Sequence, residues 1–340
     1  MNLNSPPKIA VYMIVKNGLE ELQRGFWSVI KQEQKPDAFI IVDTGSTDYT
    51  VGMLKDYKMS GEQFTLLEAF ISPWRFDDAR NLAMSAIPED IDLCISLDAD
   101  EVLAPDFIKQ ISEAWTAHPH PKPTRFNHSF TTIWDWDKEG KNISQHFHER
   151  VHARFGYRWI HPVHEKLVSA QETVGWCTAA RITQMPDMSK DRTVYLPLLQ
   201  QAVIEDPTDW KLWSFLAGEL SNQKQDYLAS RDAYEKALVQ PQADKPWLYL
   251  QLALLAEQHN NLGAAKSYFQ CALTDNPTRE MLLYTAEFWS RRELGLAMTI
   301  SYYKQALEIT NETMGYMRRE DAWNGTIEAR LNILNQEQTQ

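Results

Sequence analysis

Two carboxylates spaced by one alanine, in the segment Asp98-Ala99-Asp100, have the residue types and spacing best suited to chemistry in this 340-residue chain. They follow a short apolar run, Leu93 to Leu97, that is typical of a strand buried on both faces. Side chains two residues apart on a strand point to the same side, so both carboxylates can converge on one point. Two anions that close repel each other unless a cation lies between them, and hard oxygen ligands suit Mg²⁺ or Mn²⁺. An isolated Asp-x-Asp is more often a solvated turn, but its position after a buried strand favours a metal site.

The elements that must position this segment alternate between strand and helix through the first half of the chain. This alternation predicts an α/β domain with a mostly parallel, Rossmann-like sheet, in which ligands bind beyond the carboxyl ends of the strands. Asp43 ends the second apolar run and is expected at the same edge as Asp98. We expect strands at Ile9–Val15, Ala38–Val42, Phe64–Leu67, Leu93–Leu97, Phe130–Trp136 and Val151–Trp159, and helices at Leu19–Lys31, Tyr49–Tyr57 and Asp77–Ala86.

The second half of the chain is helical and repetitive. Strand signals disappear around 184–192, so we expect one domain over 1–183 and an all-α domain over 184–340. Ala237, Ala272 and Ala306 lie 35 and 34 residues apart (272 − 237 and 306 − 272), and each follows an aromatic residue by three positions. This period, with small residues where paired helices approach, predicts tetratricopeptide-like repeats.

Composition and charge weigh against several classes of protein. The formal net charge of −12 weighs against a surface-wide affinity for nucleic acid or anionic lipid. No apolar run approaches the ~18–20 residues of a membrane span, and the first residues lack a secretory-signal pattern. The three cysteines are widely spaced and fit neither a disulfide framework nor a zinc site. We therefore expect a cytoplasmic protein.

Several short segments, taken in order, resemble the successive motifs of family 2 glycosyltransferases with the GT-A fold. A later segment resembles the His-Glu element of one branch, the SunS-like S-glycosyltransferases, which also carry C-terminal tetratricopeptide repeats. The segments are Val15-Lys16-Asn17, Val42 to Thr50 (VDTGSTDYT), Ala79-Arg80-Asn81, Leu97 to Glu101 (LDADE) and His161 to Glu165 (HPVHE). One departure is Gly18, which replaces the acidic residue usual after the Lys-Asn pair.

The resemblance implies a role for each matching residue in holding a nucleotide-sugar donor, such as a UDP-sugar, and a divalent metal ion. Asp43 would hydrogen-bond the nucleotide base, and Arg80 would contact the base or the diphosphate. Asp98 would hold the ribose or the metal, and Asp100 would ligate the metal directly. His164 would complete the metal shell or contact the diphosphate, although a structural histidine is almost as good an interpretation.

The implied reaction is metal-dependent transfer of a sugar from its diphosphate to an acceptor. In an inverting enzyme a carboxylate removes the acceptor's proton, which is worth ~10²–10⁴ in rate. Glu165 is our choice for this base, while Asp135, Asp137 and Glu149 remain open. Because the catalytic region is short, we expect the repeat domain or a partner subunit to supply part of the acceptor site.

The sequence leaves two other functions open. One is a non-catalytic scaffold, in which a lapsed transferase domain is attached to repeats that recruit partners; retention of Asp43, Asp98 and Asp100 favours the enzyme. The other is a nucleotidyltransferase, but 9–19 contains no glycine-rich, basic phosphate loop. The acceptor class stays open between a glycan, a peptide or protein side chain and a modified DNA base. The related branch suggests a homodimer formed through the repeats.

Overall fold

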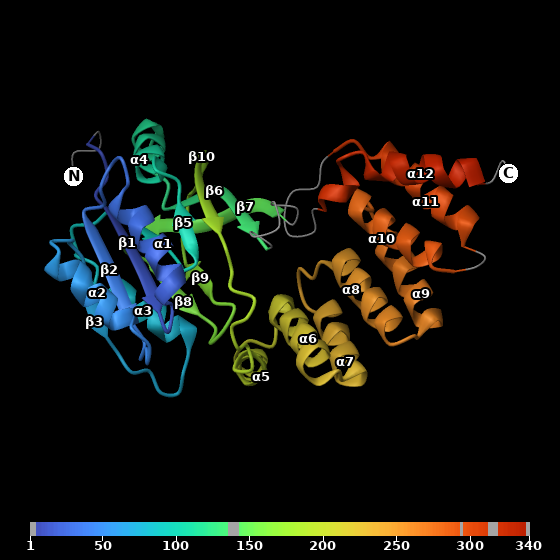
Figure 1. Cartoon of the computed structure of the whole chain (residues 1–340), viewed down its shortest axis with the longest axis horizontal. Coiled ribbons are helices and arrows are strands. Elements are labelled where there is room, and N and C mark those ends of the chain that lie inside the picture. Colours follow the sequence, from blue (N-terminus) through green and yellow to red (C-terminus); the bar gives the residue numbers. More distant parts are fainter. Residues whose placement is uncertain (1–4, 135–142, 293–294, 312–318, 338–340) are drawn as a thin grey trace. The chain divides into compact units, whose positions relative to one another are not determined.

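The computed structural model describes residues 5–134, 143–292, 295–311 and 319–337 (Figure 1). The chain divides into two compact units, Met1–Lys190 and Asp191–Gln340. The first is built on a curled, GT-A-like sheet and the second is helical, which confirms the predicted fold class. Within the described residues, no helix is both long enough and apolar enough to cross a membrane.

The main sheet of the first unit has the strand order β3-β2-β1-β4-β7-β6-β10-β5. Strands β3, β2, β1 and β4 pair in parallel, so their carboxyl ends share one edge. Beyond β4 the sheet is mixed: β7 is antiparallel to β4 and β6, β10 is parallel to β6, and β5 is antiparallel to β10. The strands are β1 Ile9–Val15, β2 Ala38–Asp43, β3 Thr65–Glu68, β4 Leu93–Ser96, β5 Glu101–Leu103, β6 Arg125–Ile133, β7 Ile143–Ala153 and β10 Val174–Gln184.

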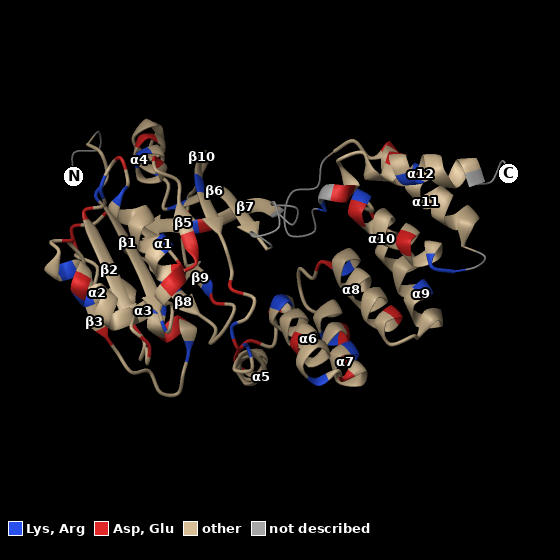
Figure 2. Ribbon diagram, in the orientation of Figure 1, with Lys and Arg blue, Asp and Glu red and all other residues tan. Residues whose placement is uncertain are grey.

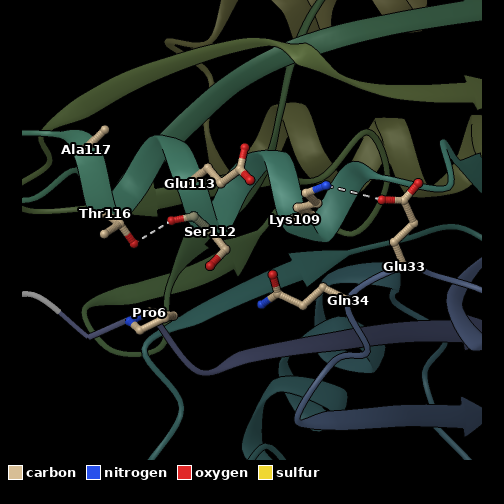
Figure 3. Close-up of a pocket in the computed structure, with 8 residues that line it drawn as sticks. All are labelled: Pro6, Glu33, Gln34, Lys109, Ser112, Glu113, Thr116 and Ala117. Carbon is tan, nitrogen blue, oxygen red and sulfur yellow. Dashed lines mark hydrogen bonds and ion pairs between the residues drawn. The ribbon is translucent and has the colours of Figure 1, made fainter.

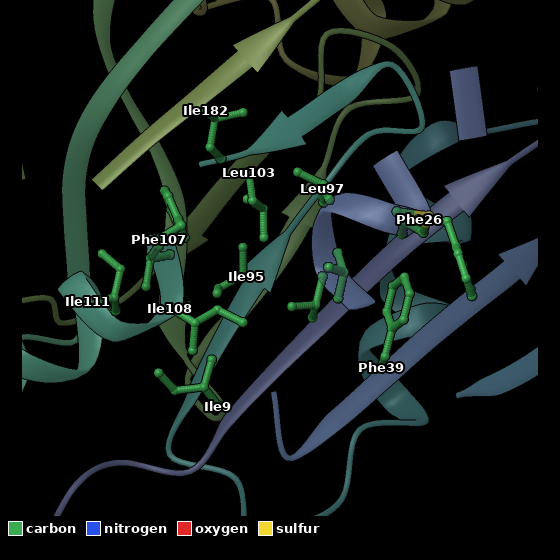
Figure 4. Packing of buried hydrophobic residues seen from close by; sticks show 14 of the residues in the cluster. Ile9, Phe26, Phe39, Ile95, Leu97, Leu103, Phe107, Ile108, Ile111 and Ile182 are labelled. Atoms are coloured by element: carbon green, nitrogen blue, oxygen red, sulfur yellow. The ribbon is translucent and has the colours of Figure 1, made fainter. Parts of the chain in front are cut away.

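In the described part of this unit the helices are α1 (Leu19–Ile30), α2 (Thr50–Met59), α3 (Phe76–Ser85) and α4 (Phe107–Ala117). Apolar residues of α1, α2 and α4 pack with the sheet into one core, part of which is shown in Figure 4. A second core joins α3 to a small hairpin of β8 (Tyr157–Ile160) and β9 (Lys166–Ser169). Strands β1, β2 and β4 contribute to both cores, which explains their continuous apolar sequences.

One predicted strand, Val151–Trp159, is wrong. The chain forms two strands there, because β7 ends at Ala153 and β8 begins at Tyr157. Gly156 lies between them with a φ of +86°, a left-handed conformation that glycine adopts without steric cost and that turns the chain. Helix α4 and strand β10 have no counterpart among the expected elements.

The second unit consists of helices that pack in pairs. Helix α6 packs on α7, α8 on α9 and α10 on α11, and the alanines Ala253 and Ala265 at one such contact are fully buried. Side chains of Asp209, Asp226 and Asp244 cap helix amino termini by accepting backbone N–H groups. The helices are α5 Tyr195–Glu205, α6 Trp210–Lys224, α7 Tyr227–Leu238, α8 Lys245–Gln258, α9 Leu262–Ala272, α10 Arg279–Ser290, α11 Leu296–Glu308 and α12 Thr326–Glu337.

A buried chain of hydrogen bonds joins β1, β7 and β8 in the first unit. The Nε1–H of Trp159 donates to the Tyr12 hydroxyl at 2.8 Å. His152 Nδ1 lies 2.8 Å from the carbonyl of Ala153, which can only accept, so this nitrogen carries the proton. Its Nε2 therefore accepts from the Tyr12 hydroxyl at 2.8 Å. The three side chains thus hold the β8 hairpin against the parallel strands and require His152 to be neutral.

This arrangement predicts that acid destabilises the first unit through His152. Burial lowers the pKa of His152 from 6.5 to about 4, so the unfolded chain binds more protons between these values. Stability is therefore fully present above pH 6.5 and falls as the pH drops toward 4, by about 3 kcal/mol for this group alone. Denaturant unfolding at pH 7 and pH 4.5 should show a smaller loss in His152→Gln than in the native protein. The exposed His120→Gln variant should behave like the native protein, and an equal loss in His152→Gln would contradict the assignment.

Candidate active site

The Asp98-Ala99-Asp100 segment lies in the loop between β4 and β5, beyond the carboxyl end of β4. Asp98 is held between two guanidinium groups, with Arg80 2.7 Å from its Oδ1 and Arg150 2.7 Å from its Oδ2. Burial acts to raise the pKa of Asp98, but Arg150 and Arg80 outweigh it and hold that pKa well below its ordinary value. Asp98 is therefore a fixed anion at this edge of the sheet.

Arg80 projects from α3 and connects this loop to the His161–Glu165 segment. Its Nε donates to Oε1 of Glu165 at 2.5 Å, and a terminal nitrogen donates to the hydroxyl of Ser96 at 3.2 Å. The guanidinium lies 4.9 Å from the centre of the Trp159 ring, so its flat face is also covered. Sequence analysis expected Arg80 at a donor site, and the structure brings it together with Asp98.

The loop that carries His164 and Glu165 is anchored to α3. Asn81 accepts from the backbone N–H of Trp159 and donates to its carbonyl, both at 2.9 Å. Within the loop, His161 and His164 adopt φ angles of +76° and +51°, which are uncommon for residues other than glycine. Such strained positions persist only where surrounding contacts impose them, and they cluster at functional sites. Glu165 lies against Arg80, whereas His164 is exposed to solvent.

Glu101 forms the floor of the site and is fully buried. Its Oε1 lies 2.5 Å from Arg150, and its Oε2 accepts the backbone N–H of Asp98 at 2.9 Å. Burial raises the pKa of Glu101, although Arg150 acts to lower it. A methyl group on Gly25 of α1 would meet the backbone oxygen of Ala99 at 2.8 Å, so only glycine lets α1 approach this loop.

Asp100 contacts the end of β10 and the residue that follows it. Its Oδ2 accepts from the side-chain amide of Gln184 at 3.2 Å, and its carbonyl accepts the N–H of Met185 at 3.0 Å. Burial and the neighbouring charge of Asp98 raise the pKa of Asp100. The two carboxylates therefore have different partners, guanidinium groups for Asp98 and a neutral amide for Asp100.

Asp43 ends β2 at the same edge of the sheet. Its Oδ1 accepts the backbone N–H groups of Gly45 and Ser46 at 3.0 and 2.9 Å, so it caps the following turn. Its Oδ2 is buried and has no hydrogen-bond partner among the residues that the structure describes. Asn17, at the end of β1, accepts the N–H of Thr47 at 2.7 Å and thereby holds the turn beside β1. Because a buried carboxylate oxygen is costly to leave unpaired, Asp43 is suited to accept an N–H from a ligand.

The charge around Asp98 favours a cation. Figure 2 marks the acidic and basic residues along the ribbon, including those of the loop between β4 and β5. Four carboxyl groups and two guanidinium groups gather here, so acidic groups outnumber basic ones by two, and a divalent cation would favour the ionised form of the acids. The set is Asp98, Asp100, Glu101, Glu165, Arg80 and Arg150.

A hollow elsewhere in this unit is lined by none of the residues of the acidic cluster. It measures about 700 Å³ and lies at the opposite end of the strands, where Pro6 precedes β1 and Gln34 follows α1 (Figure 3). Its charged residues include Lys109 and Glu33, whose side chains are 3.5 Å apart and about half exposed. Surface ion pairs of this kind contribute little to stability.

The remaining candidate bases have different surroundings. Glu149 pairs with Arg125 at 2.8 Å, and Asp135 and Asp137 lie outside the described residues. Sequence analysis assigned no role to Glu101, Arg150 or Gln184. Glu101 could have been found from its place beside the two aspartates. Arg150 and Gln184 lie on strands far along the chain, and no sequence pattern around them indicates a role in the site.

Comparison with known proteins locates a family likeness in this unit. Residues 10–164, less than half of the chain, match the model described as Glycosyl transferase family 2. This segment contains all the residues that sequence analysis proposed for donor and metal binding, namely Asp43, Arg80, Asp98, Asp100 and His164. No curated protein matches the chain.

Among solved structures, the chain is similar to residues 1–349 of S. aureus TarS, with 11% identity and a TM-score of 0.43 over 77% of this chain and 90% of that one. The same fragment in complex with UDP-GlcNAc gives 11% and 0.42 over 88% and 90%. GalNAc-T7 with UDP, GalNAc and Mn²⁺ gives 12% and 0.44 over 75% and 55%. At these values the likeness is too loose to carry a function over to this chain.

The pairing of Arg150 with buried Glu101 predicts a large stability effect. Arg150→Met leaves the Glu101 carboxylate without its cation in a site with no access to water, which should lower the free energy of unfolding by about 3–5 kcal/mol. Urea denaturation of the purified variant measures this loss. The double variant Arg150→Met/Glu101→Gln removes the stranded charge and should recover part of it. A single variant as stable as the native protein would show that the pair is not a structural requirement.

Proposed function

We propose that the N-terminal unit is a glycosyltransferase that moves a sugar from a nucleoside-diphosphate donor to an acceptor. The observation that carries this proposal is the acidic cluster beyond β4, which has more carboxylates than guanidinium groups and lies mostly within the segment that matches family 2. Such a cluster is poorly balanced alone and becomes balanced when it holds a divalent cation. Its place beyond the carboxyl ends of parallel strands is where α/β sheets bind ligands.

Asp43 is our proposal for the residue that recognises the nucleotide base. Its buried Oδ2 is an acceptor, and uracil presents an N–H donor on the edge that a carboxylate could contact. The Oδ1 bonds to Gly45 and Ser46 fix the carboxylate, so little ordering remains to be done on binding. A UDP-sugar donor fits this arrangement.

Asp98, Asp100 and His164 are the residues that we propose to hold a divalent metal, Mn²⁺ or Mg²⁺. Carboxylate oxygens are the ligands that both ions prefer, and an exposed imidazole can complete the set. When bound, such an ion would neutralise the negative charge that develops on the departing diphosphate. Arg80 is suited to contact the diphosphate as well, since it lies against Asp98.

Glu165 is our proposal for the catalytic base, the group that accepts the acceptor's proton. In the reaction the acceptor's nucleophilic atom bonds to the anomeric carbon, the bond from that carbon to the diphosphate breaks, and the acceptor's proton passes to a carboxylate. A single displacement of this kind inverts the anomeric centre. In the structure one oxygen of Glu165 is held in the ion pair with Arg80. A diphosphate that attracts Arg80 would loosen this pair and leave the carboxylate free to accept the proton.

We further propose that the C-terminal unit is an array of tetratricopeptide-like repeats that contributes to recognition of the acceptor or to a homodimer. The paired helices and the buried alanines Ala237, Ala272 and Ala306 support the repeat assignment. The acceptor could be a glycan, a peptide or protein side chain, or a modified DNA base.

The proposal predicts metal-dependent turnover of a nucleotide-sugar. With a panel of UDP-, GDP- and TDP-sugars, release of the nucleoside diphosphate should require Mn²⁺ or Mg²⁺ and should stop on chelation. Asp100→Asn should reduce the rate at least ~10²-fold, because one carboxylate ligand is lost at the point where charge develops. Asp90→Asn, a change at an exposed carboxylate beside Lys8, should leave the rate unchanged. Failure of every donor with a folded protein would favour the non-catalytic scaffold.

A second prediction concerns recognition of the nucleotide base by Asp43. Asp43→Asn replaces one carboxylate oxygen by an NH₂ group, so one of its two contacts, to the turn or to the base, loses its acceptor. We expect KM for the donor to rise ~10–100-fold, which corresponds to the loss of a hydrogen bond to a charged group, with a smaller change in kcat. The Asp56→Asn variant, at a half-buried carboxylate of α2 that accepts from the Tyr49 hydroxyl, is the control. An unchanged KM would remove Asp43 from base recognition.

A further inference from the structure

Gln184, the last residue of β10, connects Asp100 to strand β6 by hydrogen bonds. Its side-chain amide Nε2 donates to Oδ2 of Asp100 at 3.2 Å. Its Oε1 accepts from the hydroxyl of Thr132, on the neighbouring strand β6, at 3.3 Å. The three side chains thus form one chain of hydrogen bonds, from Thr132 through Gln184 to Asp100. Residue 184 lies beyond the matched segment 10–164.

Backbone hydrogen bonds also hold the end of β10 beside the loop that carries Asp100. Gln184 is paired with Glu101 in the antiparallel ladder of β10 and β5, and the N–H of Met185 donates to the carbonyl of Asp100 at 3.0 Å. Further along, Lys190 pairs with Glu21 of α1 at 2.8 Å. The segment after β10 is therefore fixed across the loop that carries Asp100, and Gln184 cannot move away without breaking these contacts.

The chemistry of the amide fixes its orientation. A carboxylate only accepts hydrogen bonds, so the NH₂ group of Gln184 must face Asp100 and its oxygen must face Thr132. In the reverse orientation two oxygens would meet without a proton between them. The Thr132 hydroxyl donates to the remaining amide oxygen, so both ends of the amide are satisfied. The bond to Asp100 uses only one of several lone pairs of the carboxylate, which leaves the others for a ligand.

We propose that Gln184 is a positioning residue for Asp100, which holds this carboxylate in the orientation that ligates the divalent metal, and that Thr132 holds Gln184 in turn. This inference rests on the proposed function, because it takes Asp100 to be a metal ligand. Groups that hydrogen-bond a ligating carboxylate fix its direction, and their loss typically weakens metal binding 10–100-fold without removing a ligand. Gln184 is neutral, so it orients Asp100 without competing with the cation as a guanidinium would.

The test is the affinity of the full chain for Mn²⁺, measured by the loss of the free-ion signal in electron paramagnetic resonance. Gln184→Met keeps the length of the side chain but removes both hydrogen bonds, and it should raise the Mn²⁺ Kd ~10-fold. Thr132→Val should raise the Kd by a smaller factor, and Thr132→Ser, which keeps the hydroxyl, should restore it. Gln145→Met, a matched change at an exposed position on β7, should have no effect. Thermal unfolding of each variant separates loss of affinity from loss of fold.

The outcomes separate the inference from the proposed function. If Asp100→Ala weakens Mn²⁺ binding while Gln184→Met leaves it unchanged, the positioning role is wrong and the metal site stands. If Asp100→Ala leaves Mn²⁺ binding unchanged, Asp100 is no ligand, and both proposals for this residue are wrong. Should Gln184→Met unfold, the Thr132→Val and Thr132→Ser pair decides: equal Mn²⁺ affinity of the two would overturn the inference.

Discussion

The site depends on the half-buried Asp98, which lies between two buried guanidinium groups. A charge of either sign is costly to remove from water, and the cost is offset only where an opposite charge and hydrogen bonds meet it. Arg80 comes from α3 and Arg150 from β7, so the ion pairs join two elements that share no local sequence. The same guanidinium groups also bind Glu165 and Glu101. The loop after β4, the floor of the site and the His161–Glu165 loop are therefore held by one connected set of charges.

The mixed half of the sheet makes this set possible. Parallel strands alone would bring only their own carboxyl ends together. Strand β7 runs antiparallel to β4 and passes the end of that strand, which delivers Arg150 to the loop from the far side. Strand β10 ends where β5 begins to pair with it, which delivers Gln184. The additional strands thus supply Arg150 and Gln184, which hold the loop, while Asp43 and Asp98 stand at the carboxyl ends of parallel strands.

The sequence predicts the acidic residues and misses most of what holds them, for a physical reason. Asp43 and Asp98 each follow a continuous apolar run, and the carboxyl end of a buried strand can be recognised locally. The partners of these residues lie far along the chain: Glu165 is 85 residues from Arg80, and Arg150 is 52 residues from Asp98. Such contacts depend on the register of β7 and β10, which no local pattern specifies. The turn at Gly156 lies inside Val151–Trp159, where apolar residues alternate with other residues as they would along a single strand.

The different partners of the two aspartates suggest different roles in the proposed reaction. Asp98 uses one oxygen for Arg80 and the other for Arg150, so a cation that approached it would have to displace or share a guanidinium. Asp100 is half-buried like Asp98, but its hydrogen-bond partner is a neutral amide. A divalent ion therefore gains more from Asp100 than from Asp98, because the attraction of Asp98 is already balanced. In this view Asp98 organises the site by orienting Arg80 toward a diphosphate, while Asp100 is the stronger ligand.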